Sequence, residues 1–453
     1  MQLYEKYKDQ QVCVLGFGIE GQATFEYLKK NGISATICDK LSRNDFIKKN
    51  PRYIEENLIL GDDYLQHLGE FDVVYKTPGI SPLIPEILKA EKNGTIFTSQ
   101  IEDFFDLCPV PIIGVTGTKG KGTTSTMIYQ MLKHAGRDVF LGGNIGIPAI
   151  SFIDDLKVDS IVVLELSSFQ LQVARKSPQI AVLLNVTSEH LDYHKDTEEY
   201  RQSKANIVRF QKESDYAVIN ADYDIPKEMT KATKSHKLYF SRFKEVAGCF
   251  VNDKDEIVLN YDQNERMGVK ASDLQLRGRH NLENATAAVL AASVAGVSLD
   301  VVTDTLIGFM GLEHRLEFVR AHNGVKYYND SFSTVPETAI AALDSFSEPI
   351  ILIAGGSSKK SDFTALGKKI ANANVKAIII IGDTAEEIKK SIPEAFDGQI
   401  VEGLTKMSEI ITKVEKLAES GDVVLLSPAS ASFGLFENYK DRGNQFKEAV
   451  FEL

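Results

Sequence analysis

The segment 112–126, IIGVTGTKGKGTTST, places a glycine-rich turn between an apolar, β-branched stretch and a run with helical spacing. Residues 112–116 have the composition of a short buried strand, and a helix is predicted from Thr123 onward. Such a unit cradles phosphate, because backbone N–H groups at the helix start face the anion and a lysine, here Lys121, adds positive charge. The strict P-loop pattern is not met, since Val115 stands in place of its first glycine. We expect a nucleoside triphosphate site here, and the alternative is a glycine turn without a ligand.

The length and charge of the chain limit the classes of protein to consider. At 453 residues the chain is too long for one hydrophobic core, so about two to three domains are expected. The net charge is −12 and no dense block of Lys or Arg appears, which argues against nucleic acid or a membrane as a partner. No secretion signal and no apolar run of about 18 residues is found. The four cysteines are scattered, which favours free thiols in the reducing cytoplasm.

A β-α-β unit with a complete G-x-G-x-x-G pattern opens the chain. A strand is predicted at residues 12–16, and the glycines follow within Gly16–Gly21. A helix predicted over 23–30 then leads to a second strand that ends at Asp39. Taken alone, this pattern indicates a dinucleotide site. An acidic, aromatic segment at 101–107 marks the first predicted domain boundary.

Metal-capable side chains follow two predicted strands of the central segment. Glu165 ends one apolar strand, and Glu189, His190 and Asp192 follow the next strand, at 180–185. Because ligands of open α/β sheets bind at the carboxyl ends of the strands, these side chains form a candidate Mg²⁺ site. The alternatives are a solvated strand end for Glu165 and a structural role for His190.

From about Glu313 the alternation of strands and helices starts again. Three strands are predicted, at 350–353, 375–381 and 422–426, followed by an amphipathic helix at 436–451. The predicted fold is therefore α/β with three domains in series: a Rossmann-like N-terminal domain, a central P-loop domain and a Rossmann-like C-terminal domain. The expected boundaries are 1–107, 108–312 and 313–453.

Five motifs together resemble the Mur ligase family, whose members couple ATP hydrolysis to amide bonds in peptidoglycan precursors. They are TGTKGK at 116–121, ELSSFQ at 165–170, NVTSEHLD at 185–192, YRQSK at 200–204 and GRHNLENA at 278–285. ELSSFQL and the tail LSPASASF at 426–433 resemble the glutamate-adding members. The similarity extends from about residue 12 to residue 446, and the family's phosphate loop also lacks the first glycine.

The resemblance implies that the protein uses ATP and two Mg²⁺ ions. The expected catalytic positions are Lys121 on the phosphates, Glu165 and His190 on Mg²⁺, and Lys204, a position that is carbamylated in the family and binds the second ion. Thr123 is the expected hydroxyl ligand of the metal. The other positions expected to bind ATP are Gly117, Thr118, Lys119, Gly120, Gly122, Thr124, Asn281, Asn284, Arg315 and Asp330.

The resemblance also implies two further substrates, UDP-N-acetylmuramoyl-L-alanine and glutamate, and a monomeric enzyme. The positions expected to contact the UDP-sugar are Gly18, Asp39, Thr77, Gly79 and Asn144, and those expected to contact glutamate are Thr334, Lys359 and Ser432. The alanyl carboxylate takes the γ-phosphate of ATP, and the glutamate amine attacks the resulting acyl phosphate. An NAD-dependent dehydrogenase and a non-catalytic nucleotide-binding regulator are the alternatives from other classes.

Two positions depart from the family pattern. Gly122 stands where the family has Ser or Thr after the lysine, so Thr123 or Thr124 must supply any side-chain hydroxyl. Phe332 stands where the family has a lysine after Asp-Ser, which removes a charge expected to face the nucleotide or the amino acid. The residues do not decide between D- and L-glutamate, and the resemblance favours the D form.

Overall fold

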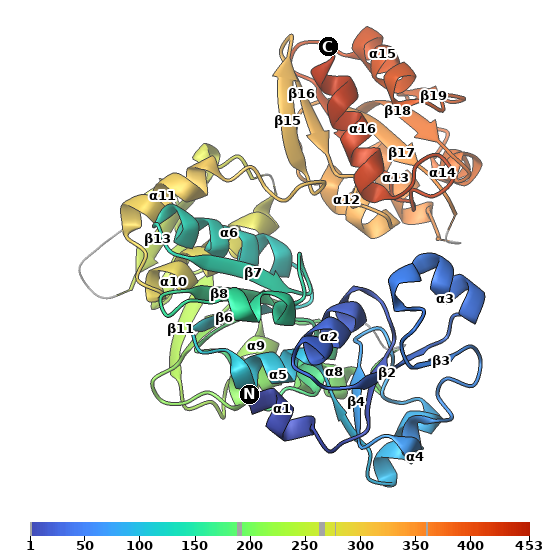
Figure 1. The fold of residues 1–453 in the computed structure, drawn as a ribbon. Helices are drawn as coiled ribbons and strands as arrows, with labels where there is room; N and C mark the ends of the chain where they lie inside the picture. Colours follow the sequence, from blue (N-terminus) through green and yellow to red (C-terminus); the bar gives the residue numbers. More distant parts are fainter. Residues whose placement is uncertain (1, 188–192, 262–267, 277, 359–360) are drawn as a thin grey trace. The chain divides into compact units, whose positions relative to one another are not determined.

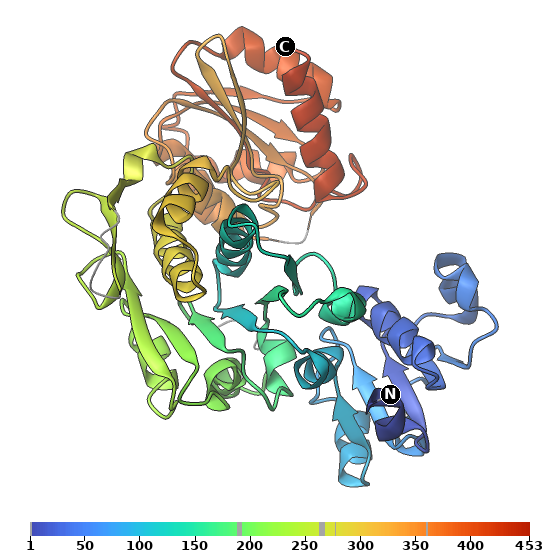
Figure 2. The same cartoon turned by 60° about the vertical axis from the view of Figure 1, so that its left-hand side comes forward.

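Three β-sheets organise the chain, of five, nine and six strands (Figures 1 and 2). The computed structural model describes all residues except 1, 188–192, 262–267, 277 and 359–360. The chain forms two compact units. The first comprises Met1–Lys270 and Glu283–Leu306 and contains the five-stranded and nine-stranded sheets; the second comprises Ala271–Leu282 and Ile307–Leu453 and contains the six-stranded sheet. Among the residues described, no helix has both the length and the apolar composition that a bilayer span requires.

The five-stranded sheet is entirely parallel and has the order β3-β2-β1-β4-β5, so the order reverses beside β1. Its strands are β1 Val12–Leu15, β2 Ala35–Asp39, β3 Leu58–Leu60, β4 Val73–Lys76 and β5 Ile96–Thr98. The helices of this part are α1 Gln2–Tyr7, α2 Ile19–Lys30, α3 Arg43–Lys49, α4 Pro85–Lys92 and α5 Gln100–Leu107, with 3₁₀ turns η1 Pro51–Tyr53 and η2 Leu68–Glu70. The predicted β-α-β unit is confirmed, although α2 begins four residues earlier than expected.

The nine-stranded sheet has the order β14-β13-β12-β11-β10-β9-β6-β8-β7, with β6 between β8 and β9. Its strands are β6 Ile112–Thr116, β7 Val139–Gly143, β8 Ile161–Glu165, β9 Ile180–Leu183, β10 Tyr216–Asn220, β11 His236–Ser241, β12 Gly248–Val251, β13 Glu256–Asn260 and β14 Gly268–Lys270. The associated helices are α6 Lys121–His134, α7 Ser168–Gln172, α8 Thr197–Arg209, α9 Asp224–Met229, α10 Arg279–Val294 and α11 Leu299–Gly308, with 3₁₀ turns η3 Ala149–Asp155 and η4 Ala271–Asp273. Every residue of β6 is buried, as its apolar sequence predicts for a parallel strand covered on both faces.

The six-stranded sheet has the order β15-β16-β20-β17-β18-β19, and only the edge strand β15 is antiparallel to its neighbour. The strands are β15 Glu317–His322, β16 Val325–Asn329, β17 Ile350–Gly355, β18 Val375–Ile381, β19 Gln399–Val401 and β20 Val423–Leu426. The helices are α12 Pro336–Leu343, α13 Thr364–Asn372, α14 Ala385–Ser391, α15 Met407–Leu417 and α16 Tyr439–Phe451. Helices α12, α13 and α14 pack against one face, and α15 and α16 against the other (Figure 1).

All three sheets place the ends of two or more parallel strands at one edge, where the expected site residues lie. In open α/β sheets ligands bind at that edge, beside the strand at which the order reverses. β1 and β6 hold this position in the sheets of the first unit, and each is followed by a glycine-rich turn and a helix. The fold class predicted from the sequence, three α/β domains with parallel sheets, is confirmed.

Candidate active site

The phosphate loop joins β6 to α6, and its glycines are required by close packing. Gly120 caps α6 with a φ of 88°, a left-handed conformation that favours glycine. A Cβ at Gly120 would also clash with the amide oxygen of Asn284, at the start of α10 in the same unit. A Cβ at Gly117 would lie 2.7 Å from the Cβ of Leu184, so the loop passes directly over the end of β9. The helix begins at Lys121, two residues earlier than predicted. Its first unpaired N–H groups therefore lie within the glycine-rich segment.

Thr118 holds the loop in place through three contacts with other elements. Its backbone N–H donates to the carbonyl of Asn185 at 2.8 Å, and its hydroxyl accepts from the N–H of Thr187 at 2.9 Å. The same hydroxyl lies 3.0 Å from the hydroxyl of Tyr200 on α8. The loop, the segment after β9 and α8 thus form one hydrogen-bonded body. Lys119, by contrast, is exposed.

Two lysine side chains converge on the carbonyl of Gly117. Lys121 Nζ donates to this oxygen at 3.1 Å and to the carbonyl of Thr118 at 3.0 Å. Lys204 Nζ, on α8, donates to the same Gly117 oxygen at 2.9 Å and is buried. Two ammonium groups so close together repel each other, and an anion such as a phosphate beside them would offset this repulsion. This is the electrostatic environment that a triphosphate requires.

Glu165 ends β8, as predicted, and the structure shows that its side chain is buried. The side-chain amide of Asn144 donates to the Glu165 carboxylate at 2.6 Å, and the N–H of Asn144 donates to the Glu165 carbonyl at 2.8 Å. Asn144 therefore grips both the backbone and the side chain of the expected metal ligand. The side chain that is expected to contact the UDP-sugar thus also orients the carboxylate of Glu165.

The expected metal ligands fit Mg²⁺ only as far as the structure describes them. Glu165 supplies a buried carboxylate of the kind Mg²⁺ prefers. Glu189, His190 and Asp192 lie outside the described residues, and within the described ranges no cluster of three metal-ligating side chains is found. Of the two candidate hydroxyls, Thr124 Oγ is buried and has no hydrogen-bond partner among the residues described, whereas Thr123 is almost as buried and its hydroxyl is not orphaned in this way.

The glycine-rich loop after β1 divides into a packed part and an open part. A Cβ at Gly16 would clash with the hydroxyl of Thr77, and one at Gly21 with the carbonyl of Gly16. A Cβ at Gly18 or Gly79 would meet nothing within 4 Å. Of the glycines in the loops after β1 and β4, Gly18 and Gly79 therefore leave room for a ligand to approach the backbone.

Asp39 stabilises the turn of that loop. One carboxylate oxygen accepts from the N–H of Phe17 at 2.8 Å, and the other accepts from the N–H of Leu41 at 3.0 Å. Thr77 donates to the carbonyl of Leu15 at 3.0 Å, which ties the end of β4 to β1. In dinucleotide enzymes the acidic residue at this position accepts from the ribose hydroxyls, and here both oxygens already accept from the backbone.

In the second unit the expected residues gather at the ends of β16 and β20. Asp330 is buried and accepts from the hydroxyl of Ser427 at 2.8 Å and from the N–H of Leu316 at 3.2 Å. Burial raises the pKa of Asp330 to about 7, opposed by these hydrogen bonds and by the positive charge of Arg315. Thr334 is half-buried and Ser432 is buried, while Lys359 lies outside the described residues.

Phe332, the departure from the family lysine, has its own partners. Its ring lies 4.0 Å below the guanidinium of Arg315 and 5.0 Å from the ring of Tyr439 in an edge-on contact. A cation–π contact of this kind is worth about 0.5–1 kcal/mol at an exposed site. The substitution therefore replaces a second cation with a surface that orients Arg315.

Several polar contacts between the two sheets of the first unit could not be found from the sequence. Glu20 on α2 accepts from the side-chain amide of Gln170 at 2.7 Å, across 150 residues of chain. Lys76, at the end of β4, donates to the hydroxyl of Tyr193 at 2.7 Å. Burial raises the pKa of Glu20 and lowers the pKa of Lys76 to about 8. Gln170 belongs to the ELSSFQ motif, and its amide oxygen also caps α7 through the N–H of Ser167, so part of that motif is structural.

Comparison with known proteins covers all three sheets. Three family models match the chain: Mur ligase MurD-like, N-terminal domain over residues 10–99, Mur ligase middle domain over 115–292, and Mur ligase, glutamate ligase domain over 314–430. A UDP-N-acetylmuramoylalanine–D-glutamate ligase of Acetivibrio thermocellus is 43% identical over 455 residues, covering 98% of this chain and 97% of that protein. One of Clostridium botulinum is 38% identical over 462 residues, covering 99% of each.

Solved structures of low sequence identity share the fold. UDP-N-acetylmuramate-alanine ligase MurC of Thermotoga maritima aligns with a TM-score of 0.60 at 18% identity, covering 98% of this chain and 99% of that one. MurF of Acinetobacter baumannii aligns with a TM-score of 0.62 at 17% identity, covering 88% and 83%. The domain models and the relatives that match from end to end show that this chain belongs to the Mur ligase family.

Proposed function

We propose that this ligase adds D-glutamate to UDP-N-acetylmuramoyl-L-alanine with hydrolysis of ATP, in the cytoplasm and as a monomer. The observation that carries the proposal is the phosphate loop after β6, with Lys121 on the loop and the buried carboxylate of Glu165 at the neighbouring strand end. The substrates come from the full-length relatives, which are named as D-glutamate ligases of this UDP-sugar. Neither the domain models nor these relatives support a dehydrogenase.

The reaction follows from groups that the chain presents. The alanyl carboxylate attacks the γ-phosphate of ATP, which gives an acyl phosphate and ADP. The amine of glutamate then attacks the acyl carbon, phosphate leaves, and the amine gives up its proton. Lys121 and the N–H groups at the start of α6 hold the phosphates and offset the repulsion between two anionic reactants. The glycines at 117 and 120 let the loop pack against Leu184 and Asn284, where any Cβ would clash, and so fix the backbone that faces the phosphates.

Mur ligases use Mg²⁺, which supplies positive charge to the transferring phosphoryl group. Glu165, His190, Thr123 and a carbamylated Lys204 would hold two ions. Carbamylation converts Lys204 from a cation into an anion, which removes the like-charge contact with Lys121 at the Gly117 carbonyl. Lys204→Ala should lose most activity and recover part of it with added acetate, and full activity of this variant at limiting Mg²⁺ would exclude the role.

The domains divide the substrates in this proposal. Residues 1–107 bind the UDP group at Gly18, Thr77 and Gly79, with Asp39 shaping the loop. Residues 108–312 bind ATP at the phosphate loop, with Asn281 and Asn284 near the nucleotide. Residues 313–453 bind glutamate through Thr334, Lys359 and Ser432, and contribute Arg315 and Asp330 to the nucleotide. The cation of Lys359 and the hydroxyls of Thr334 and Ser432 suit the two carboxylates of glutamate. Neutral analogues, which lack one of these charges, should bind much more weakly.

The test is phosphate release from ATP in the full-length protein with each component omitted in turn. Release should require UDP-N-acetylmuramoyl-L-alanine and D-glutamate together, while L-glutamate and D-glutamine should give at most a few per cent of the rate. Equal release without the UDP-sugar would refute the ligase assignment. Coupling of L-glutamate with D-glutamate inert would refute only the choice of enantiomer.

A further inference from the structure

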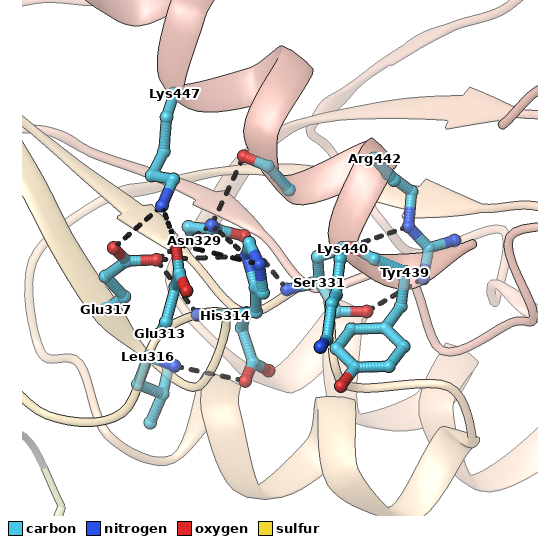
Figure 3. Close-up of polar contacts among 12 residues, drawn as sticks. Glu313, His314, Leu316, Glu317, Asn329, Ser331, Tyr439, Lys440, Arg442 and Lys447 are labelled. Carbon is cyan, nitrogen blue, oxygen red and sulfur yellow. Dashed lines mark hydrogen bonds and ion pairs between the residues drawn. The ribbon is translucent and has the colours of Figure 1, made fainter. Parts of the chain in front are cut away.

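Arg442, on α16, is the largest side chain of the second unit that is completely buried, with an exposed fraction of 0% (Figure 3). None of the residues expected to bind a substrate lies on this helix. Burial lowers the pKa of Arg442 to about 10, and the charge of Asp330 acts in the opposite direction. No carboxylate among the described residues forms an ion pair with the guanidinium within 4.0 Å. A buried cation without an acidic partner is costly, so its retention requires an explanation.

The guanidinium is satisfied almost entirely by backbone carbonyls. Arg442 Nε donates to the hydroxyl of Ser331 at 3.0 Å, and Nη2 donates to the carbonyls of Ser331 at 2.9 Å and Ser430 at 3.2 Å. Nη1 donates to the carbonyls of Ser430 at 3.2 Å and Ala431 at 3.3 Å. The planar fork thus bridges the segment after β16 and the segment after β20.

Attachment of α16 to the sheet does not need this charge. Phe446 and Val450 of α16 are completely buried in the hydrophobic core of that face. Gly443 accepts at its carbonyl from the side chain of Asn329 at 3.3 Å, and a Cβ at Gly443 would clash with the ring of His314. These apolar and backbone contacts attach α16 to the sheet without using the guanidinium.

The two bridged segments carry the expected glutamate contacts. Thr334 lies three residues after Ser331, and Ser432 directly follows Ala431. The segment after β20 is also constrained by Ala429, whose φ of 56° is left-handed, and by the N–H of Ser357, which donates to the Ala431 carbonyl at 2.9 Å. A guanidinium that draws four acceptors of both segments together sets the distance between the two hydroxyls.

We infer that Arg442 is a positioning residue for the incoming amino acid, because it joins the segments that present Thr334 and Ser432. It does not touch the substrate. The inference rests on the proposed function for the identity of the substrate. It predicts that loss of the fork weakens glutamate binding and leaves the UDP-sugar and ATP sites intact.

The test uses three variants of the full-length protein and a matched control. Arg442→Met removes the donors, and Arg442→Lys keeps the charge without the fork. Ser331→Ala removes one acceptor of the fork, together with the hydrogen bond that the same hydroxyl donates to the carbonyl of Tyr439 at 2.8 Å. Arg320 also donates from its guanidinium to backbone carbonyls of α16, those of Val450 at 3.3 Å and Phe451 at 3.2 Å, so Arg320→Met is the control. The readouts are the three KM values, the melting temperature, and hydrogen–deuterium exchange of the peptides 331–334 and 430–432.

In Arg442→Met the KM for glutamate should rise about tenfold or more, with the KM for ATP and for the UDP-sugar within about twofold of wild type. Arg442→Lys and Ser331→Ala should show smaller rises in the KM for glutamate. Hydrogen–deuterium exchange of both peptides should increase in the Arg442 and Ser331 variants and stay unchanged in Arg320→Met. An unchanged glutamate KM, or an equal rise in all three KM values, would overturn the inference; if Arg442→Met does not fold, the two milder variants decide. Absence of glutamate-dependent phosphate release in the wild type would refute the proposed function alone, because the exchange measurement still tests Arg442.

Discussion

Two side chains, Asn144 and Phe332, make contacts that their positions in the sequence do not reveal. Asn144 was expected near the UDP-sugar, and its amide donates to Glu165. Phe332 replaces the lysine of the family pattern, and its ring packs under the guanidinium of Arg315. In both positions the side chain acts on a neighbouring functional group, and such contacts depend on the fold because the partners are 21 and 17 residues apart in the chain.

The bond from Asn144 to Glu165 predicts a specific defect in metal use. Asn144→Ala should raise the Mg²⁺ concentration for half-maximal activity about 10–100-fold, because it removes the group that orients and stabilises the carboxylate. Phosphate release measured against Mg²⁺ concentration checks this. Gln66→Ala is the control, since Gln66 also donates to a carboxylate, Asp63 at 2.9 Å, on the surface. An unchanged Mg²⁺ requirement together with a raised KM for the UDP-sugar would show that Asn144 acts on the substrate and not on the metal ligand.

Strands and helices were predicted best where long apolar runs determine them. The fully buried β6, the largely buried β8 and β18, and the amphipathic run that contains α16 were all predicted within a few residues. The strands β3, β5 and β19 were missed, because three residues are too few to show a period of two. Arg442 was missed as a functional residue because a charged position on an amphipathic helix ordinarily faces water.

The junction of β16 and β20 predicts a pH dependence through Asp330. The pKa of Asp330 is about 7 in the folded protein and about 4 in the unfolded chain. Between about pH 4 and about pH 7, folding is therefore accompanied by the binding of a proton to this carboxylate. Asp330 therefore stabilises the fold most at low pH, and the contribution declines as the pH rises towards the folded pKa. Relative to Asp330→Asn, the wild type should lose roughly 2 kcal/mol of stability between pH 5.5 and 7 and change little above pH 8.

Hydrogen–deuterium exchange of β16 and β20, compared between wild type and Asp330→Asn at each pH, measures this difference without interference from intrinsic exchange rates. At low pH the protonated Asp330 of the wild type and the amide of Asp330→Asn are both neutral. The two proteins therefore carry the same charge at this position there. A difference in opening free energy that is constant from pH 5.5 to 8.5 would show that Asp330 does not titrate in this range.

At the scale of the whole molecule, three domains of similar architecture must bind different ligands. The three sheets share the strand-edge position of their sites, so the fold alone does not separate a UDP site from an NAD site. The separation has to come from the groups at each edge. In the first sheet these are the open glycines Gly18 and Gly79 and the carboxylate of Asp39, which accepts from two backbone N–H groups.

These groups predict that the full-length protein binds UDP and not NAD. The proposed UDP-sugar substrate requires a uridine nucleotide site in this domain, and the open backbone at Gly18 can approach its pyrophosphate while Asp39 holds the turn through Phe17 and Leu41. At about 100 times its Kd, UDP should stabilise the protein by about 2.7 kcal/mol, and NAD should give no shift in the melting temperature.

Glycine substitutions make the prediction specific to the loop. Gly18 has a φ of −74° and space for a Cβ, so Gly18→Ala should leave the ligand-free melting temperature unchanged and abolish most of the UDP shift. Gly69, in the same domain, also has space for a Cβ, and Gly69→Ala should keep the full shift. A shift with NAD and none with UDP would restore the dehydrogenase interpretation of the first domain. A UDP shift that survives in Gly18→Ala would place the nucleotide elsewhere on the chain.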